Sequence, residues 1–219
     1  MNKRLTIALV LLLLLSTYKV QNFFDLSSTF RIKEISIENN LILNDSEIKQ
    51  ALAFLYETNI LLLQTEKIKT ELDKVSFIES FEIKKIYPNS IKIKILEKKP
   101  IAILQNKKQK NFYTDKGKLI SFDDFDEFKN LPFVFGDKDS FLVLHTHLKE
   151  VNFPLNDIKT FFLFKSNRWD IITQKNQTLK LPIDDYKKSL KNFLIIKDQV
   201  NFEKYKTFDY RINNQLILK

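Results

Sequence analysis

The chain has 219 residues, of which 44% are hydrophobic and 29% are charged, a composition typical of a globular protein with one large domain or two small ones. Its two glycines, Gly117 and Gly136, argue against glycine-rich phosphate-binding loops, and the absence of cysteine excludes disulfides and thiol nucleophiles. The net charge of +9 is not concentrated, because most lysines alternate with isoleucines or lie beside acidic residues, so it does not indicate nucleic-acid binding.

The N-terminal segment is apolar and follows a basic tip at residues 1–4. Residues 5–15 form an almost uninterrupted apolar run, and further apolar residues follow Lys19. No pair of small residues typical of a signal-peptide cleavage site comes after this run. We therefore predict a transmembrane anchor over residues 5–24, with the N-terminus in the cytoplasm and the rest of the chain outside it. A cleaved signal peptide is the alternative, because the apolar core is shorter than the usual span of about 20 residues.

Residues 30–100 predict a small α+β domain. Isoleucines alternate with polar residues at 35–37 and again at 91–95, which is the pattern of strands with one buried face. Apolar residues at helical spacing predict two short helices between them, and Asn44 with Glu47 fits a capping box at the start of the first. A further strand precedes the last one. The expected fold is therefore a three-stranded sheet, in the order strand, helix, helix, strand, strand, with both helices on one face.

Residues 101–219 predict a second, mostly antiparallel β domain with flanking helices. Short apolar segments alternate there with turn residues, which is typical of hairpins. The expected elements, in chain order, are a hairpin around Asp115 and Gly117, a strand at 131–136, a helix near Phe153–Phe164, hairpin arms at 168–172 and 179–182 around Asn176-Gln177, a helix capped by Asp184 or Asp185 that reaches Phe193, and final strands at 208–212 and 215–219.

Three groups of residues have side chains that could serve chemistry. His145 and His147 would share one face of a strand and could begin a metal site, but a third ligand at a fitting spacing is not evident. The acidic cluster around Asp123 alternates with phenylalanines, so it is better explained as a solvated loop or helix face than as a cation site. Trp169 and the neighbouring phenylalanines are interpreted as core. We predict no catalytic residue, no metal and no cofactor.

Several short motifs together indicate a family. They are Ile35-x-Ile37-x-Asn39-Asn40, Asn59-Ile-Leu-x-Leu63, Phe77-Ile78-x-Ser80-Phe81, Ile83-Lys84-Lys85-x-Tyr87-Pro88 and Glu97-x-x-Pro100-Ile-Ala102. With these motifs the first domain resembles a POTRA domain, and its details resemble the FtsQ/DivIB family of bacterial cell-division proteins. Residues 112–120 and 168–182 resemble the β domain that follows POTRA in that family. Asparagine stands at Asn39 where the family often has glycine, and it tolerates the same backbone.

The resemblance implies a function. It implies a non-enzymatic divisome scaffold in the inner membrane, single-pass, with its bulk in the periplasm at the division septum. Its partners would be FtsB and FtsL, together with other divisome proteins contacted through POTRA and the transmembrane helix. Through these contacts it would help control septal peptidoglycan synthesis.

The resemblance also implies where FtsB docks. The last strand of the chain is expected at a sheet edge, where unpaired backbone groups can accept a partner's strand. Arg211 falls on a family arginine at the end of the penultimate strand, and Arg168 lies near a family arginine that faces the partner. The implied partner-binding residues are Arg168, Arg211, Ile212, Gln215, Leu216, Ile217 and Leu218. A second contact, on POTRA, would consist of Ser80, Glu82 and Lys84.

Two other functions compete with this interpretation. A POTRA-containing chaperone of secretion or outer-membrane assembly would be followed by many alternating segments of about ten residues. A membrane-tethered cell-wall enzyme would need a cleft with convergent carboxylates of perturbed pKa.

Overall fold

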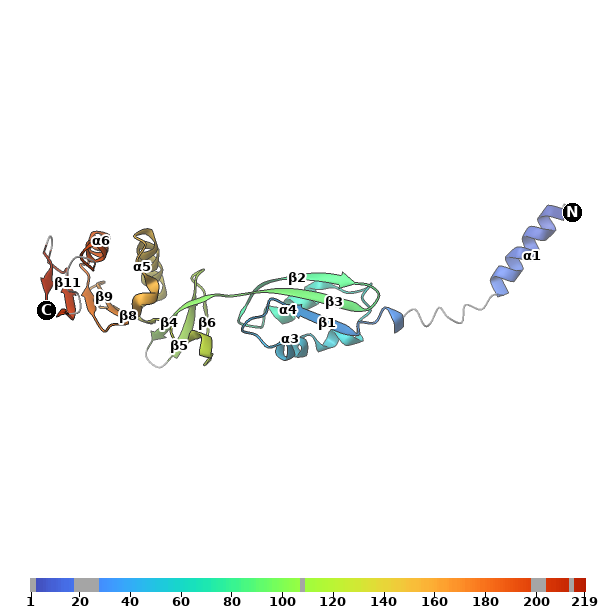
Figure 1. Cartoon of the computed structure of the whole chain (residues 1–219). Coiled ribbons are helices and arrows are strands. Elements are labelled where there is room, and N and C mark those ends of the chain that lie inside the picture. Colours follow the sequence, from blue (N-terminus) through green and yellow to red (C-terminus); the bar gives the residue numbers. More distant parts are fainter. Residues whose placement is uncertain (1–2, 18–27, 107–108, 198–203, 213–214) are drawn as a thin grey trace. The chain divides into compact units, whose positions relative to one another are not determined.

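The computed structural model describes residues 3–17, 28–106, 109–197, 204–212 and 215–219 (Figure 1). The chain divides into two compact units, Met1–Glu97 and Lys98–Lys219. The domain boundary expected after Pro100 stays a prediction.

The first helix, α1, spans Lys3–Thr17 and is followed by residues outside the described part of the chain. Among the described residues, no helix is both long and apolar enough to cross a bilayer. Residues 18–24, which complete the expected anchor, lie outside the described residues.

The first unit contains the expected three-stranded sheet, with strands in the order β1-β3-β2. Its elements are β1 (Glu34–Glu38), α3 (Asp45–Ala51), the 3-10 helix η2 (Ala53–Glu57), α4 (Thr65–Leu72), β2 (Ile78–Ile86) and β3 (Ser90–Glu97). Strand β3 runs parallel to β1 and antiparallel to β2. Ile91, Ile93 and Ile95 are buried while the lysines between them reach solvent, so only one face of β3 contributes to the core.

Helix α3, the first helix after β1, differs from the expectation in two respects. It ends at Ala51 and continues only as the 3-10 turn η2, so the apolar stripe is divided between two short elements. Asn44 occupies the N-cap position, but its backbone carbonyl and not its side chain accepts the N–H groups of Glu47 and Ile48. The expected capping box is therefore wrong.

Glu97 fixes the far end of this unit, where β3 ends. Its carboxylate accepts backbone N–H groups from three successive residues, Leu41 at 3.1 Å, Ile42 at 3.0 Å and Leu43 at 2.8 Å. The loop between β1 and α3 is thereby held against the last residue of the sheet.

The second unit is built on a nine-stranded sheet with the order β12-β11-β10-β9-β8-β7-β4-β5-β6. Its strands are β4 (Pro100–Asn106), β5 (Gln109–Thr114), β6 (Leu119–Ser121), β7 (Phe133–Phe135), β8 (Ile158–Leu163), β9 (Trp169–Thr173), β10 (Thr178–Lys180), β11 (Thr207–Asp209) and β12 (Ile217–Leu218). Its helices are α5 (Lys138–Glu150) and α6 (Tyr186–Lys197), with 3-10 turns η3 (Asp126–Phe128) and η4 (Leu155–Asp157).

Helices α5 and α6 pack on one face of this sheet. The ring of Phe141 in α5 lies 5.2 Å from that of Phe161 in β8, and Phe193 in α6 lies 5.2 Å from Phe208 in β11. Strand residues that alternate with these point to the opposite side, which we call the outer face; there the rings of Phe135 and Phe162 stack at 4.7 Å. The fold is therefore α+β, with a helix-covered face and an outer face in the second unit.

The helix expected near Phe153–Phe164 is wrong, because residues 158–163 form strand β8. The helix lies earlier, where the Asp137 side chain accepts the N–H groups of Asp139 and Ser140 and so caps α5. Aromatic and β-branched residues in β8 favour a strand, and pairing with β7 and β9 stabilises it.

The two histidines lie on α5 and not on a strand. Two residues apart on a helix, they point about 200° away from each other, so they do not converge on one ion. Burial lowers the pKa of His145 to about 4, with a further contribution from Lys149. The Nδ1 atom of His147 lies 2.6 Å from the hydroxyl of Tyr186 on α6. The expectation that the two histidines share one face of a strand is therefore wrong.

Other expectations for the second unit are confirmed. Gly117 has the positive φ, 73°, that its turn between β5 and β6 requires, and Asn176 provides φ 58° between β9 and β10. The acidic side chains around Asp126 are exposed, while Phe122 and Phe128 pack on Phe112. Trp169 and Phe161 are core residues.

Candidate functional site

The candidate site occupies the end of the sheet formed by β9, β10, β11 and β12. Register places Asp170 of β9 opposite Lys180 of β10, and Lys180 opposite Asp209 of β11. These three side chains share the outer face, because the residues next to them, Ile171 and Phe208 among others, are in the core. A row of alternating charge thus crosses three neighbouring strands.

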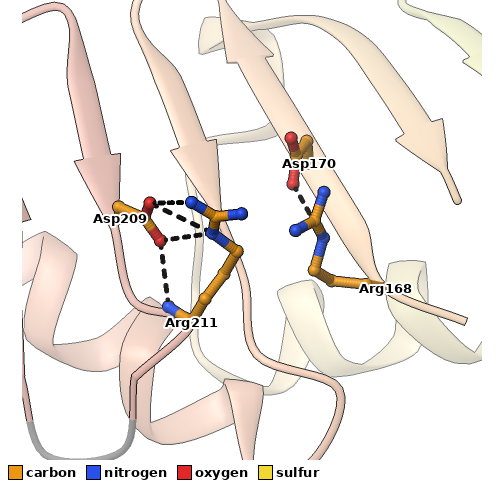
Figure 2. A network of polar contacts seen from close by, with 4 residues as sticks. All are labelled: Arg168, Asp170, Asp209 and Arg211. Atoms are coloured by element: carbon orange, nitrogen blue, oxygen red, sulfur yellow. Dashed lines mark hydrogen bonds and ion pairs between the residues drawn. The ribbon is translucent and has the colours of Figure 1, made fainter. Parts of the chain in front are cut away.

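Arg211 is bound to Asp209 by a bidentate contact (Figure 2). Its Nε donates to Oδ1 at 2.8 Å and its Nη2 to Oδ2 at 2.6 Å, while its backbone N–H donates to Oδ1 at 3.1 Å. The hydrogen bonds from the Arg211 side chain lower the pKa of Asp209, against the opposing effect of burial. The Arg211 side chain nevertheless keeps 45% of its surface exposed. It is therefore a well-oriented guanidinium that a second anion can approach.

Arg168 makes a poorer contact with Asp170. Its Nε lies 3.5 Å from Oδ1, and within the described part of the chain neither of these buried atoms has a hydrogen-bond partner. Burial raises the pKa of Asp170, although Arg168, Lys180 and Arg211 oppose that shift. The guanidinium carbon of Arg168 lies 4.4 Å from the ring centroid of Phe164, over its face. Figure 2 shows Arg168 reaching toward Asp170 while Arg211 lies against Asp209.

Strand β12 is at the edge of the nine-stranded sheet. Among the described residues it pairs with β11 alone, with Ile217 opposite Asp209 and Leu218 opposite Phe208. Thr207 and Lys219 exchange both backbone hydrogen bonds, at 2.9 and 3.1 Å. Because such pairs alternate along an antiparallel ladder, the N–H and C=O of Leu218 face away from β11. The side chain of Ile217 lies on the outer face beside the charged row, and that of Leu218 packs on the core.

A pocket of about 590 Å³ lies beside this edge, between α6 and the segment that leads to β12. Ile212, Gln215 and Leu216 line it from that segment, and Asn192 and Ile196 line it from α6. Ile212 keeps 51% of its surface exposed. The Tyr210 hydroxyl donates to Asn192 Oδ1 at 3.0 Å, and burial raises the pKa of Tyr210 to about 12. The lining of the pocket is mixed, with apolar side chains such as Ile196 and Leu216 beside polar ones such as Asn192 and Gln215.

The structure brings most of the predicted residues together. Arg168 and Arg211 join the charged row, Ile217 and Leu218 form β12, and the other three line the pocket. The strands are shorter than expected, because β11 ends at Asp209 and leaves Arg211 and Ile212 beyond it. The second predicted group is on β2 of the first unit, where Ser80, Glu82 and Lys84 are exposed at alternate positions.

Asp170, Lys180 and Asp209 are not among the residues predicted from the sequence. Each aspartate lies two residues from an arginine, in the segments Arg168-Trp169-Asp170 and Asp209-Tyr210-Arg211. An acidic residue two positions from a basic one shares its face of a strand, so this spacing was the available signal.

Comparisons with known proteins agree with the motifs. The family model described as "POTRA domain, FtsQ-type" matches residues 30–98. The cell division protein FtsQ of Rickettsia typhi is 25% identical over 208 residues, covering 92% of this chain and 78% of its own. FtsQ of Agrobacterium fabrum is 21% identical over 166 residues, covering 74% of this chain and 51% of its own.

One solved structure was also found similar, that of the major extracytoplasmic domain of the trans isomer of the cell division protein DivIB from Geobacillus stearothermophilus. It is 13% identical with a TM-score of 0.33, and the match covers 48% of this chain and 96% of that one.

Proposed function

Because the chain belongs to the FtsQ/DivIB family of bacterial cell-division proteins, we propose that it is a non-enzymatic divisome scaffold that binds an FtsB–FtsL complex through the β12 edge. The observation that carries this proposal is the position of β12 at the sheet edge, beside two arginines and a pocket. Each of these features suits a different part of a bound segment.

The edge suits the backbone of the bound segment. A strand added to β12 would pair with the N–H and C=O of Leu218, which face away from β11. Main-chain hydrogen bonds of this kind provide affinity with little dependence on sequence. Specificity must then come from side chains on either side of the new strand.

The arginines suit an acidic side chain. Arg211 is oriented by Asp209 yet remains 45% exposed, so a carboxylate from the partner can bind it without displacing Asp209. Arg168 is less accessible, because its side chain is only 17% exposed and its Nε is buried, so it would add positive charge to this face more than a direct contact. An FtsB-like partner should therefore carry an acidic residue close to its pairing strand.

The pocket suits an apolar side chain. It lies on the α6 side of the edge, whereas the charged row lies on the outer face, so one bound strand can use both through alternate residues. Ile212 presents an exposed apolar surface there. In this family an aromatic residue often stands at that position, so the contact here would be aliphatic packing without ring stacking.

The remaining parts of the scaffold follow from the family. We propose that residues 5–24 anchor the chain in the inner membrane and that residues 30–100 and 101–219 are its two periplasmic domains at the septum. Ser80, Glu82 and Lys84 on POTRA provide a second contact surface for divisome proteins. By holding these partners together the protein helps control septal peptidoglycan synthesis.

Co-purification with the FtsB-like and FtsL-like proteins of the same organism tests the edge. The full chain should retain both proteins, a chain truncated after Ile212 should lose them, and Leu218→Pro should bind much more weakly because it removes the outward N–H. Leu218→Val is the matched control, since it keeps that N–H with a similar side chain. Equal retention by the full chain, the truncated chain and Leu218→Pro would sink the edge assignment.

A further inference from the structure

Four apolar side chains are exposed together at one end of the first unit. Leu61 is 53% exposed, Leu62 77%, Ile86 40% and Tyr87 59%. They come from two turns that are more than twenty residues apart in sequence. A single exposed leucine is ordinary in a soluble protein, but four large apolar residues on neighbouring turns indicate a contact surface.

Hydrogen bonds bring these two turns to the place where the chain enters β1. The N–H of Ile60 donates to the carbonyl of Phe30 at 2.8 Å, and the N–H of Lys33 donates to the carbonyl of Asn89 at 2.8 Å. The Asn59 side chain accepts the N–H of Leu61 at 2.9 Å, which fixes the first turn. We call residues 31–33, 59–62 and 85–88 the proximal end. Its leucines are presented by ordered backbone.

The charges at the proximal end are mixed with a small basic excess. Arg31, Lys33 and Lys85 of the proximal end are basic, and Glu34 and Glu57, just outside it, are acidic. The only ion pair recorded among these five described residues is a long one, 4.0 Å between Arg31 and Glu57, with both side chains largely exposed. Exposed leucine and tyrosine side chains together with nearby lysine and arginine are a composition suited to a bilayer interface.

Chain length places this end close to the apolar N-terminal segment. Ten residues separate Thr17, the last residue of α1, from Ser28. A chain of that length spans at most about 40 Å even when fully extended. Attachment through so short a segment gives the proximal end a high effective concentration at any membrane that holds the N-terminal segment, so a weak contact is sufficient.

We propose that the proximal end of the first unit rests on the phospholipid surface of the membrane that holds the anchor. This inference depends on the anchor in the proposed function. Leu61 and Leu62 would enter the headgroup layer, Tyr87 would lie at its boundary, and the basic side chains would meet anionic headgroups. The contact would keep the unit against the bilayer.

The full chain offers a clean test, because it has no native cysteine. Leu62→Cys would carry a polarity-sensitive fluorophore, with the chain reconstituted in vesicles of phosphatidylethanolamine and phosphatidylglycerol. The control is Leu41→Cys, since Leu41 is 85% exposed and lies beside Glu97 at the opposite end of the same unit. The label at position 62 should shift to the blue and be quenched by quencher-bearing lipid. The label at position 41 should show neither change.

The outcomes separate this inference from the anchor. Resistance of the chain to extraction from vesicles at alkaline pH reports on the anchor alone. If the chain resists extraction while both labels report water, the lipid contact is wrong and the anchor stands. If the chain is extracted, the anchor is wrong, and the label at position 62 still reports at neutral pH whether the end touches lipid. The blue shift at position 62 could instead depend on the density of protein in the vesicles and not on lipid. That result would overturn the inference and indicate that a second copy of the chain covers this end.

Discussion

Two arginine–aspartate pairs lie on the same face of the sheet, and their sequences are mirror images: Arg168-Trp169-Asp170 at the start of β9 and Asp209-Tyr210-Arg211 at the end of β11. They behave differently. Asp209 receives three hydrogen bonds from the Arg211 side chain and one from its backbone, whereas among the described residues the Asp170 carboxylate makes a single ion pair, at 3.5 Å. The pKa of Asp209 is lowered and that of Asp170 is raised.

The difference shows that the number of donors, and not the proximity of a positive charge, decides what a buried carboxylate contributes. Arg211 follows the strand, so its backbone and side chain both turn back onto Asp209. Arg168 precedes β9 and lies on the ring of Phe164, which directs its guanidinium away from an ideal geometry with Asp170. Desolvation of Asp170 is therefore incompletely offset.

The largest effect is expected for the well-bonded pair. Asp209→Ala should lower the free energy of unfolding by about 1–2 kcal/mol, a loss reduced by the partial exposure of Arg211. Urea unfolding of the full chain can be followed by the fluorescence of Trp169, the single tryptophan, which is buried in the second unit. Asp209→Asn keeps an acceptor and should lose less. No change in either variant would show that the bidentate contact is not stabilising.

Removing the charge of Asp170, in the poorly bonded pair, should change the free energy of unfolding in the opposite direction. Asp170→Asn removes a charge that burial disfavours, so we expect the free energy of unfolding at pH 7 to rise by up to about 1 kcal/mol. The same Trp169 fluorescence measures it. A loss of similar size would mean that attraction to Arg168 outweighs the desolvation of Asp170.

The contributions of Asp209 and Asp170 to the free energy of unfolding should also depend on pH in opposite directions. Asp209, with its lowered pKa, stabilises the fold above the unfolded value of about 3.9 and loses this effect as the pH falls through the folded pKa. Asp170, with its raised pKa, favours the fold in acid, and this effect is lost as the pH rises from about 3.9 through the folded pKa.

Unfolding curves measured from pH 3 to pH 7 should therefore show both differences from wild type shrinking in acid. The Asp170→Asn difference should start to shrink at a higher pH than the Asp209→Asn difference. If the two differences from wild type shrank over the same pH range, the opposite pKa directions of Asp170 and Asp209 would be contradicted.

Much of the first unit could be predicted because its signals are local. The alternation of Ile91, Ile93 and Ile95 with lysines identifies β3 directly, and the order of elements then determines the sheet. The prediction of a helix near Phe153–Phe164 was wrong because the aromatic residues there fit both the helical and the strand periodicity. Pairing with β7 and β9 stabilises the strand.

The site was predicted only in part, for a similar reason. The edge position of β12 follows from strand order, but the charged row depends on the register between Lys180 and Asp209, which α6 separates in the chain. Register between strands that are distant in sequence is set by tertiary packing, so no local pattern reveals it. The spacing of aspartate and arginine hinted at shared faces without identifying the partner strands.

The smallest expected effect concerns the ring that supports Arg168. Phe164→Leu keeps an apolar side chain at a position that is 43% exposed but removes the aromatic face lying 4.4 Å from the guanidinium. We expect a loss of about 0.5 kcal/mol in the free energy of unfolding, measured by Trp169 fluorescence. In the Asp170→Asn background the loss should be larger, because Arg168 then has no carboxylate opposite it and depends more on the ring. Equal losses in the two backgrounds would show that Phe164 and Asp170 act independently on Arg168, and the contrast between the two pairs would then rest on hydrogen-bond geometry alone.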